Sequence, residues 1–366
     1  MGLNMNVNMA EITRLTRAGR LAEAMALLRG RPAQPTPSAA PITSGEQAAA
    51  LRPQGLRKFL NGLGKLGASP LGLSHPRAPA ELPLPAGARF EARAYANHAG
   101  SRIYKLYIPS RYDGAPLPLI VMLHGCKQSP NDFAAGTQMN ALAEEELFLV
   151  AYPAQSSAAN PSHCWNWFSA ADQQRDAGEA SLIAGITRQI MQDVAVDPAR
   201  VYVAGLSAGG AAAAIMGSAY PDLYAAIGVH SGLACGAARD MPSAFAAMRQ
   251  GGPIPRRDGK PMPTIVFHGD RDVTVSPVNS DQVIAQSKGA AEFAPAVDRG
   301  QSAGGVPYTR TLQTDTGGRA ILEQWVLHGA GHAWSGGSAA GSYTDPRGPD
   351  ASREMVRFFL QHAAQN

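Results

Sequence analysis

A serine in a glycine-rich turn is the first residue whose type and surroundings could do chemistry. Ser207 is the central residue of GLSAG at 205–209, which fits the pattern G-x-S-x-G. The apolar segment 200–204 precedes this turn as an expected strand, and 208–220 follows it as an expected helix. A sharp strand-to-helix turn holds a serine in a strained backbone conformation with its hydroxyl exposed. The alternative is a glycine-rich turn with an incidental serine, but the flanking pattern favours Ser207 as a nucleophile.

A serine hydroxyl is a weak nucleophile until a base removes its proton, and histidine suits this task because it titrates near neutral pH. His332 lies on a glycine-flanked loop after the expected strand 321–326, and we predict it to be the general base. His328, which lies nearer the strand end, is the alternative. His230 and His268 follow other expected strands, and we expect both to be hydrogen-bonded histidines of the core or its rim.

The carboxylate that orients the base is expected between the serine and the histidine along the chain. The segment HGDRDV at 268–273 follows the expected strand 264–267 and contains two candidates, Asp270 and Asp272. Aspartate often bonds to its own backbone in turns, and we assign that role to Asp270. Asp272 is therefore the predicted acid of the triad.

A developing oxyanion needs hydrogen-bond donors that are already in place. In a serine hydrolase with this turn, one donor is the amide after the nucleophile, and another follows an earlier buried strand. The sequence LHGC at 123–126 ends the first long apolar segment, so the backbone N–H groups of Cys126 and Ala208 are the predicted oxyanion hole, and His124 is expected to be structural. Because these donors are backbone groups, replacing Cys126 with serine should spare activity, provided that the thiol has no other role.

Aromatic residues lie close to these motifs along the chain. Trp165, Trp167 and Phe168 belong to CWNWF at 164–168, and Trp334 lies two residues after the predicted base. Exposed aromatic side chains could bind an apolar acyl or alkyl chain, so the three tryptophans are predicted substrate contacts. The alternative is that these side chains pack at the rim of the core.

Apolar segments alternate with helical patterns over most of the chain. This alternation predicts a mostly parallel sheet with helices on both faces, and with the serine turn it predicts the α/β-hydrolase fold. Two alternating segments, 90–96 and 102–108, are expected to pair at a sheet edge. The expected buried strands are 117–123, 147–152, 201–204, 225–229, 264–267 and 321–326, and the expected helices are 135–146, 177–194, 208–220 and 352–362.

The catalytic domain is predicted to span 87–366, after a partly disordered N-terminal extension, 1–86. Within the extension, 9–28 has the spacing of an amphipathic helix, 31–50 and 70–85 are rich in proline, and 56–66 is a short apolar and basic segment. One hypothesis is that 9–28 and 56–66 contact a lipid or polymer-granule surface. The alternative is that they pack on the catalytic domain or remain disordered.

Composition excludes several classes of protein. A net charge of +4 over 366 residues, without a dense block of lysine and arginine, argues against a nucleic-acid partner. No apolar run approaches the roughly 20 residues of a membrane span, so no transmembrane segment is expected. The N-terminal residues lack the features of a signal peptide, which favours the cytoplasm. The three cysteines form no C-x-x-C pair, so no metal site is predicted. Cys126 and Cys164 could form a disulfide, since both are expected near the active-site edge.

Several segments together resemble the poly(3-hydroxybutyrate) depolymerase family of esterases, which is similar to feruloyl and acetylxylan esterases. The resemblance covers about 102–362, and the matching blocks are LHGCKQ at 123, YPAQ at 152, CWNWF at 164, VDPARVYVAGLSAGGAAA at 196, YPDLYAAIGVHSGL at 220, TIVFHGDRDVTVSP at 264 and GHAW at 331. Matched motif by motif, the family's triad falls on Ser207, Asp272 and His332. Many members of this family are secreted, which conflicts with the cytoplasmic expectation.

The resemblance implies a serine esterase that needs no cofactor and acts on ester bonds of poly- or oligo-(3-hydroxybutyrate). One alternative is a feruloyl- or acetylxylan-type carbohydrate esterase, or a general short-chain carboxylesterase. A hydrolase fold kept only as a binding module is a further alternative, which the complete set of triad residues disfavours. The sequence does not give the oligomeric state.

Overall fold

The computed structural model describes residues 84–253 and 259–364. The helix expected over 9–28, the apolar and basic segment 56–66 and the proline-rich stretches before residue 84 lie outside the described residues. No helix of the described residues is long and apolar enough to cross a membrane.

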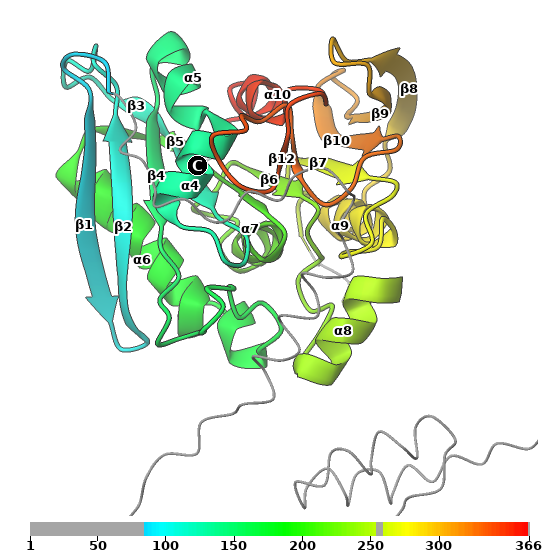
Figure 1. Ribbon diagram of the computed structural model, residues 1–366, viewed down its shortest axis with the longest axis horizontal. Helices are drawn as coiled ribbons and strands as arrows, with labels where there is room; N and C mark the ends of the chain where they lie inside the picture. Colours follow the sequence, from blue (N-terminus) through cyan, green and yellow to red (C-terminus); the bar gives the residue numbers. More distant parts are fainter. Residues whose placement is uncertain (1–83, 254–258, 365–366) are drawn as a thin grey trace, which may run out of the picture. The chain divides into compact units, whose positions relative to one another are not determined.

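A ten-stranded sheet forms the centre of the described chain, in the order β1-β2-β4-β3-β5-β6-β7-β10-β9-β8 (Figure 1). The strands β4, β3, β5, β6, β7 and β10 run parallel to one another, whereas β1–β2 and β9–β8 are antiparallel pairs at the two edges. The bounds are β1 (Arg89–Asn97), β2 (Gly100–Ile108), β3 (Leu117–Leu123), β4 (Leu149–Pro153), β5 (Val196–Leu206), β6 (Ala226–His230), β7 (Thr264–Gly269), β8 (Ala294–Gln301), β9 (Pro307–Thr314) and β10 (Ala320–Leu327).

Helices cover both faces of this sheet, and each face has its own apolar core. The first core packs α6 (Gly178–Asp193), α7 (Ala208–Ala219), α8 (Met241–Gln250) and α9 (Val278–Lys288) against one face. The second packs α4 (Pro130–Thr137), α5 (Met139–Glu146) and α10 (Ala351–Phe359) against the other. Residues of β4, β6 and β7 are buried throughout, as expected for strands covered on both sides.

The expected strands and helices are confirmed with shifts of a few residues, except for one helix. The single helix expected over 135–146 is two helices, because Gln138 between α4 and α5 adopts a left-handed conformation with φ of 54°. The amide of Gln138 still donates the last i→i−4 bond of α4, to the carbonyl oxygen of Ala134, and its left-handed backbone then turns the chain out of that helix.

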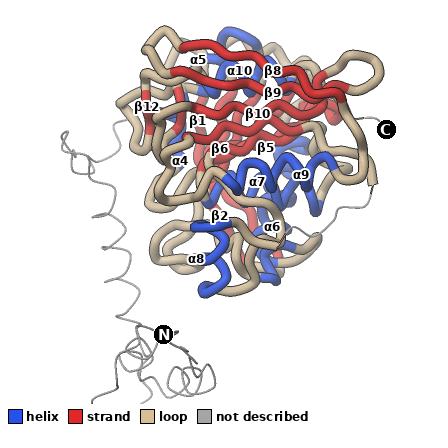
Figure 2. The backbone as a smooth tube through the Cα atoms, turned by 90° about the vertical axis from the view of Figure 1, so that its right-hand side faces the viewer, coloured by secondary structure: helices blue, strands red, loops and turns tan. Residues whose placement is uncertain are grey.

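The hairpin of β8 and β9 was not expected from the sequence. It follows α9 and extends the sheet beyond β10, as Figure 2 shows. A short 3-10 helix, η1 (Ala170–Gln173), precedes α6, and a small parallel pair, β11 (Trp334–Ser335) and β12 (Thr344–Asp345), lies after β10.

Candidate active site

Ser207 lies at the junction of β5 and α7, where the sequence predicts a strained turn. Its backbone has φ of 57° and ψ of −119°, a combination that non-glycine residues rarely adopt. The amide of Ser207 donates to the carbonyl oxygen of His230 at the end of β6, over 2.9 Å. The neighbouring strand therefore holds the strained residue in place, and the side chain remains half-buried rather than covered.

The glycines around Ser207 allow the turn to lie close to β3 and to the first turn of α7. A Cβ atom on Gly205 would overlap the carbonyl oxygen of Gly209, and one on Gly209 would overlap the carbonyl oxygen of Leu123. Both obstacles are backbone atoms, which cannot move aside as a flexible side chain would. The G-x-S-x-G pattern is thus a packing requirement of this junction as well as a signature.

Asp272 and His332 form a close hydrogen-bonded pair. The Nδ1 atom of His332 lies 2.6 Å from Oδ2 of Asp272, a residue that is only 5% exposed. The other carboxylate oxygen accepts hydrogen bonds from the amides of Thr274 (2.8 Å) and Val275 (2.9 Å). Because both oxygens of Asp272 accept hydrogen bonds, its carboxylate is fixed in position and His332 is oriented by it.

A second histidine, His268, approaches the same carboxylate. Its Nε2 atom lies 3.4 Å from Oδ2 of Asp272 and donates to the carbonyl oxygen of Val275 at 2.9 Å. Burial by itself would raise the pKa of Asp272, but the contacts with His268 and His332 outweigh it and hold that pKa well below its usual range. The carboxyl is therefore ionised at neutral pH, as the orienting acid of a triad must be.

The two alternatives that the sequence left open form a separate pair. His328 lies 2.9 Å from Oδ2 of Asp270, whose other oxygen accepts a hydrogen bond from the amide of Gly329. Both side chains are more than one third exposed. Asp270 therefore fastens the beginning of the 328–332 loop, and it is Asp272 that contacts His332.

His230 links the serine turn to the loop that follows His332. Its carbonyl oxygen binds the amide of Ser207, and its Nε2 atom accepts a hydrogen bond from the amide of Ser335 at 3.0 Å. The imidazole stacks on Trp334, with ring centroids 5.2 Å apart. Burial lowers the pKa of His230 to about 3, so the ring is neutral and can accept this bond. The expectation of buried, hydrogen-bonded core histidines is confirmed for His230 and His268.

The predicted oxyanion-hole segment lies beside the nucleophile. A Cβ atom on Gly125 would come within 3.7 Å of the Cβ atom of Ser207, which places 124–126 against the serine turn. Within the part of the chain that the structure describes, the amides of Cys126 and Ala208 donate no hydrogen bond to another residue. His124 is 1% exposed, and its Nε2 accepts a hydrogen bond from the amide of Gln155, consistent with a structural role.

Cys126 and Cys164 form a disulfide, with their Cα atoms 4.2 Å apart. The pairing proposed from the sequence is thereby confirmed. The sulfur of Cys126 consequently has a role of its own, and the condition under which Cys126→Ser would be harmless does not hold.

The prediction that tryptophans form an exposed substrate surface is wrong for Trp165 and Trp334. They are 0% and 1% exposed, and their indole N–H groups donate to the carbonyl oxygen of His124 and to Oγ of Ser352. Trp167 is only 7% exposed. These side chains are large enough to fill the space behind the loops that carry them, so they support those loops from within.

Several known proteins are similar to this chain. The family model described as "Esterase PHB depolymerase" matches residues 102–305. A poly(3-hydroxyalkanoate) depolymerase C of Paucimonas lemoignei is 32% identical over 60% of this chain and 55% of its own length. A feruloyl esterase B of Thermothelomyces thermophilus is 27% identical over 62% of this chain and 82% of its own length. The chain thus spans about half the length of the depolymerase that it matches.

Solved structures support the fold. An acetyl xylan esterase of Aspergillus awamori superposes with a TM-score of 0.60 at 20% identity, covering 75% of this chain and 99% of that one. An S-formylglutathione hydrolase of Agrobacterium tumefaciens superposes with a TM-score of 0.52 at 13% identity, covering 77% of this chain and 98% of that one. The predicted α/β-hydrolase fold is confirmed.

Proposed function

Because the chain belongs to the esterase PHB depolymerase family, we propose that it is a serine esterase that hydrolyses carboxylic ester bonds through an acyl-enzyme. Two observations carry this proposal: the 2.6 Å contact between His332 and the buried Asp272 carboxylate, and the strained backbone of Ser207 at the end of β5. Nucleophilic ester cleavage requires a hydrogen-bonded acid and base together with an exposed serine on such a turn, and the proposal is that the three act as one triad.

In the proposed reaction, the hydroxyl of Ser207 attacks the ester carbonyl carbon while Nε2 of His332 takes its proton. The amides of Cys126 and Ala208 stabilise the negative oxygen of the tetrahedral intermediate. When the intermediate collapses, the ester C–O bond breaks and His332 returns the proton to the leaving alkoxide. A water molecule activated by His332 then attacks the acyl-enzyme and releases the acid. Asp272 fixes the tautomer of His332 and stabilises its protonated form throughout.

We propose poly- or oligo-(3-hydroxybutyrate)-type esters as the substrates. The matched family and two relatives named as depolymerases, from Paucimonas lemoignei and Ralstonia pickettii, support this class. The alternative is a feruloyl- or acetylxylan-type ester, which relatives named for those activities support.

A substrate panel tests both parts of the proposal. Hydroxybutyrate oligomers, amorphous polymer granules, a feruloyl sugar ester, acetylated xylan and p-nitrophenyl butyrate are assayed with the wild type and with Ser207→Ala. We expect turnover of the oligomers to exceed that of the carbohydrate esters, and Ser207→Ala to lose turnover of every substrate. Preference for the feruloyl or acetyl ester would replace the proposed substrate class, and full activity of Ser207→Ala would remove the proposed chemistry.

A further inference from the structure

A buried carboxylate lies outside the triad, in the first turn of α6. Glu179 is 5% exposed and forms an ion pair with Arg102 of β2, whose Nη2 lies 3.1 Å from Oε1. Burying a charge is costly unless it is paired and hydrogen-bonded, so a carboxylate kept here needs an explanation. Burial also raises the pKa of Glu179, despite the donors around it.

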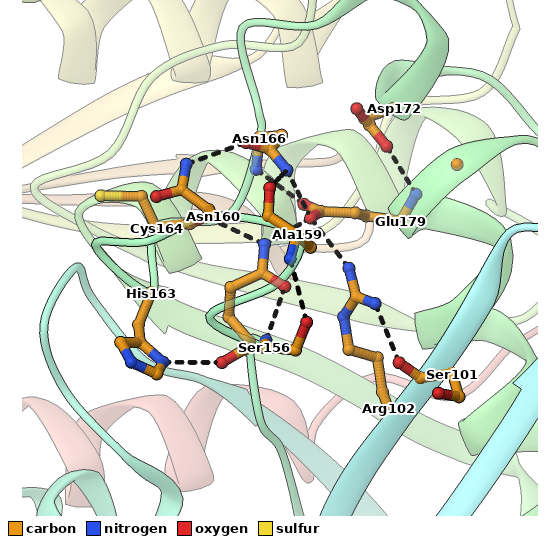
Figure 3. Close-up of polar contacts among 12 residues, drawn as sticks. Ser101, Arg102, Ser156, Ala159, Asn160, His163, Cys164, Asn166, Asp172 and Glu179 are labelled. Atoms are coloured by element: carbon orange, nitrogen blue, oxygen red, sulfur yellow. Dashed lines mark hydrogen bonds and ion pairs between the residues drawn. The ribbon is translucent and has the colours of Figure 1, made fainter. Parts of the chain in front are cut away.

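Glu179 accepts three further hydrogen bonds, and all of them come from one loop, 154–169, between β4 and η1 (Figure 3). Oε1 accepts from Nε2 of Gln155 and from Nδ2 of Asn166, the latter over 2.8 Å. Oε2 accepts from the backbone amide of Asn166 over 2.6 Å. One carboxylate therefore holds both the beginning of this loop and the part that lies beside Cys164.

The same loop is attached at several points to the segment that contains the proposed oxyanion donor. Cys164 is bonded to Cys126, and the amide of Lys127 donates to the carbonyl oxygen of Ser162 at 2.8 Å. His124 is held from two sides, since its Nε2 accepts from the amide of Gln155 and its carbonyl oxygen accepts from the indole of Trp165. Because of these attachments, a displacement of the 154–169 loop should also displace the 124–127 segment.

The side chain of Gln155 makes the connection direct. Its Nε2 donates both to Oε1 of Glu179 and to the carbonyl oxygen of Cys164, the second bond being 2.9 Å long. Two hydrogen bonds join Glu179 to Cys164 through the side chain of Gln155, and the disulfide joins Cys164 to Cys126, the residue that carries the proposed oxyanion donor.

We propose that Glu179 is a positioning residue for the oxyanion hole: by fixing the 154–169 loop, it sets the place of the Cys126 N–H relative to Ser207. This inference rests on the proposed serine-esterase function and assigns a role to a residue that touches neither substrate nor triad. A buried ion pair contributes little net stability compared with apolar residues of similar size. The four hydrogen bonds that Glu179 accepts, from Arg102, Gln155 and Asn166, instead fix the position of the loop closely.

The test replaces the carboxylate with its amide, Glu179→Gln. An amide has one accepting oxygen, so if the three bonds at Oε1 are kept, the new NH₂ group faces the amide of Asn166 and that bond is lost. The matched control is Glu323→Gln. Glu323 is 0% exposed and bonds to Arg310, Trp325 and Arg357; among the residues that the structure describes, none of its hydrogen bonds reaches the 124–127 or 154–169 segments.

Active sites are titrated with a fluorophosphonate, so that kcat and KM are expressed per active site. We also measure inhibition by a trifluoromethyl ketone, because this inhibitor forms a tetrahedral oxyanion on a serine. Complete loss of an oxyanion donor costs about 10²–10³ in kcat, so a displaced donor should lower kcat about tenfold while KM changes by less than about twofold. The inhibition constant should rise by the same factor as kcat falls. The pH profile of kcat/KM should keep its shape, because the contact between His332 and Asp272 is intact.

A wild-type value of kcat per titrated site in Glu179→Gln would overturn the inference. An equal fall of kcat in Glu323→Gln would also overturn it, because it would indicate a general effect of lost stability. If Glu179→Gln does not fold, Gln155→Met takes its place, since it removes the donor that joins Glu179 to Cys164 at similar volume; the same kinetic changes are expected, and unchanged kcat would overturn the inference. Ser207→Ala is assayed in parallel: its activity decides the proposed function, independently of Glu179.

Discussion

Asp270 and Asp272 are two residues apart, yet their surroundings give them different properties. Asp272 is buried and contacts His332 and His268, whereas Asp270 is more than one third exposed and contacts His328. A carboxylate in a dry, fixed environment stabilises an imidazolium more strongly than one that water can screen. The same residue type is thus an orienting acid at one position and a loop anchor at the other.

Replacing each aspartate with asparagine separates these roles. Asp272→Asn should lower kcat/KM for p-nitrophenyl butyrate by about 10³–10⁴-fold, because His332 would lose the partner that sets its tautomer. Asp270→Asn should cost less than about tenfold, since it loosens one attachment of the loop. If Asp270→Asn had the larger effect, the assignment of the acid would be wrong.

The depressed pKa of Asp272 also predicts a pH dependence of stability. A carboxyl whose folded pKa lies below its unfolded value contributes stability that is complete above the unfolded value, near 3.8, and is lost as the pH falls through the folded value. Denaturant unfolding of the wild type and of Asp272→Asn should therefore show a difference in unfolding free energy that is nearly constant down to about pH 5 and shrinks as the pH is lowered from about 5 to about 2. A difference that stays constant over this range would contradict the assigned pKa direction.

At the scale of elements, the junction of β5 and α7 depends on the close approach of Gly209 to β3. A Cβ at Gly209 would overlap backbone of 123–124, whereas one at Gly331 would meet nothing within 4 Å. We expect Gly209→Ala to destabilise the fold by about 3 kcal/mol or more, and Gly331→Ala to change stability by less than about 0.5 kcal/mol. Urea unfolding measures the stability of both variants. If Gly209→Ala were as stable as Gly331→Ala, the junction would tolerate a side chain at Gly209.

The sequence was sufficient for the elements whose residues are buried in a regular pattern. The strands β3, β4, β6 and β7 consist of buried residues almost throughout, so their apolar segments stand out. The hairpin of β8 and β9 was missed because nearly all of β8 is exposed and has no apolar alternation. The helix α9 was missed because Asn279 and Ser280 are buried polar residues, which conceal its inward face.

The site was predictable where chain order and turn chemistry restrict the choice, and not where tertiary contacts decide. Ser207, Asp272 and His332 follow from strand ends and glycines, and the structure brings Asp272 and His332 into contact. The contact of His268 with Asp272 depends on how two loops meet, so position along the chain could not reveal it. Glu179 had one weak signal, a carboxylate at the start of an expected helix, and its partners are distant in sequence.

For the molecule as a whole, the disulfide between Cys126 and Cys164 closes a separation of 38 residues. Removing it with Cys126→Ala and Cys164→Ala together should lower the unfolding free energy by about 4 kcal/mol, because the unfolded chain gains the freedom of the opened loop. Denaturant unfolding measures this change. Thiol titration of the denatured wild type should find two fewer thiols without reductant than with it, and equal counts would show that the bond is not formed.

This bond also bears on where the protein works. Disulfides persist in oxidising compartments and are rare in the cytosol. The Cys126–Cys164 bond is therefore expected to stay intact in an oxidising compartment and to be open to reduction where thiols are kept reduced.

The proposed mechanism depends on Ser207 being the nucleophile. The most direct measurement is intact-mass analysis of the protein after reaction with a fluorophosphonate, followed by peptide mapping of the adduct. We expect one adduct per chain on Ser207, no adduct on Ser207→Ala, and loss of esterase activity in proportion to labelling. An adduct on another residue, or an active enzyme that carries the label on Ser207, would contradict it.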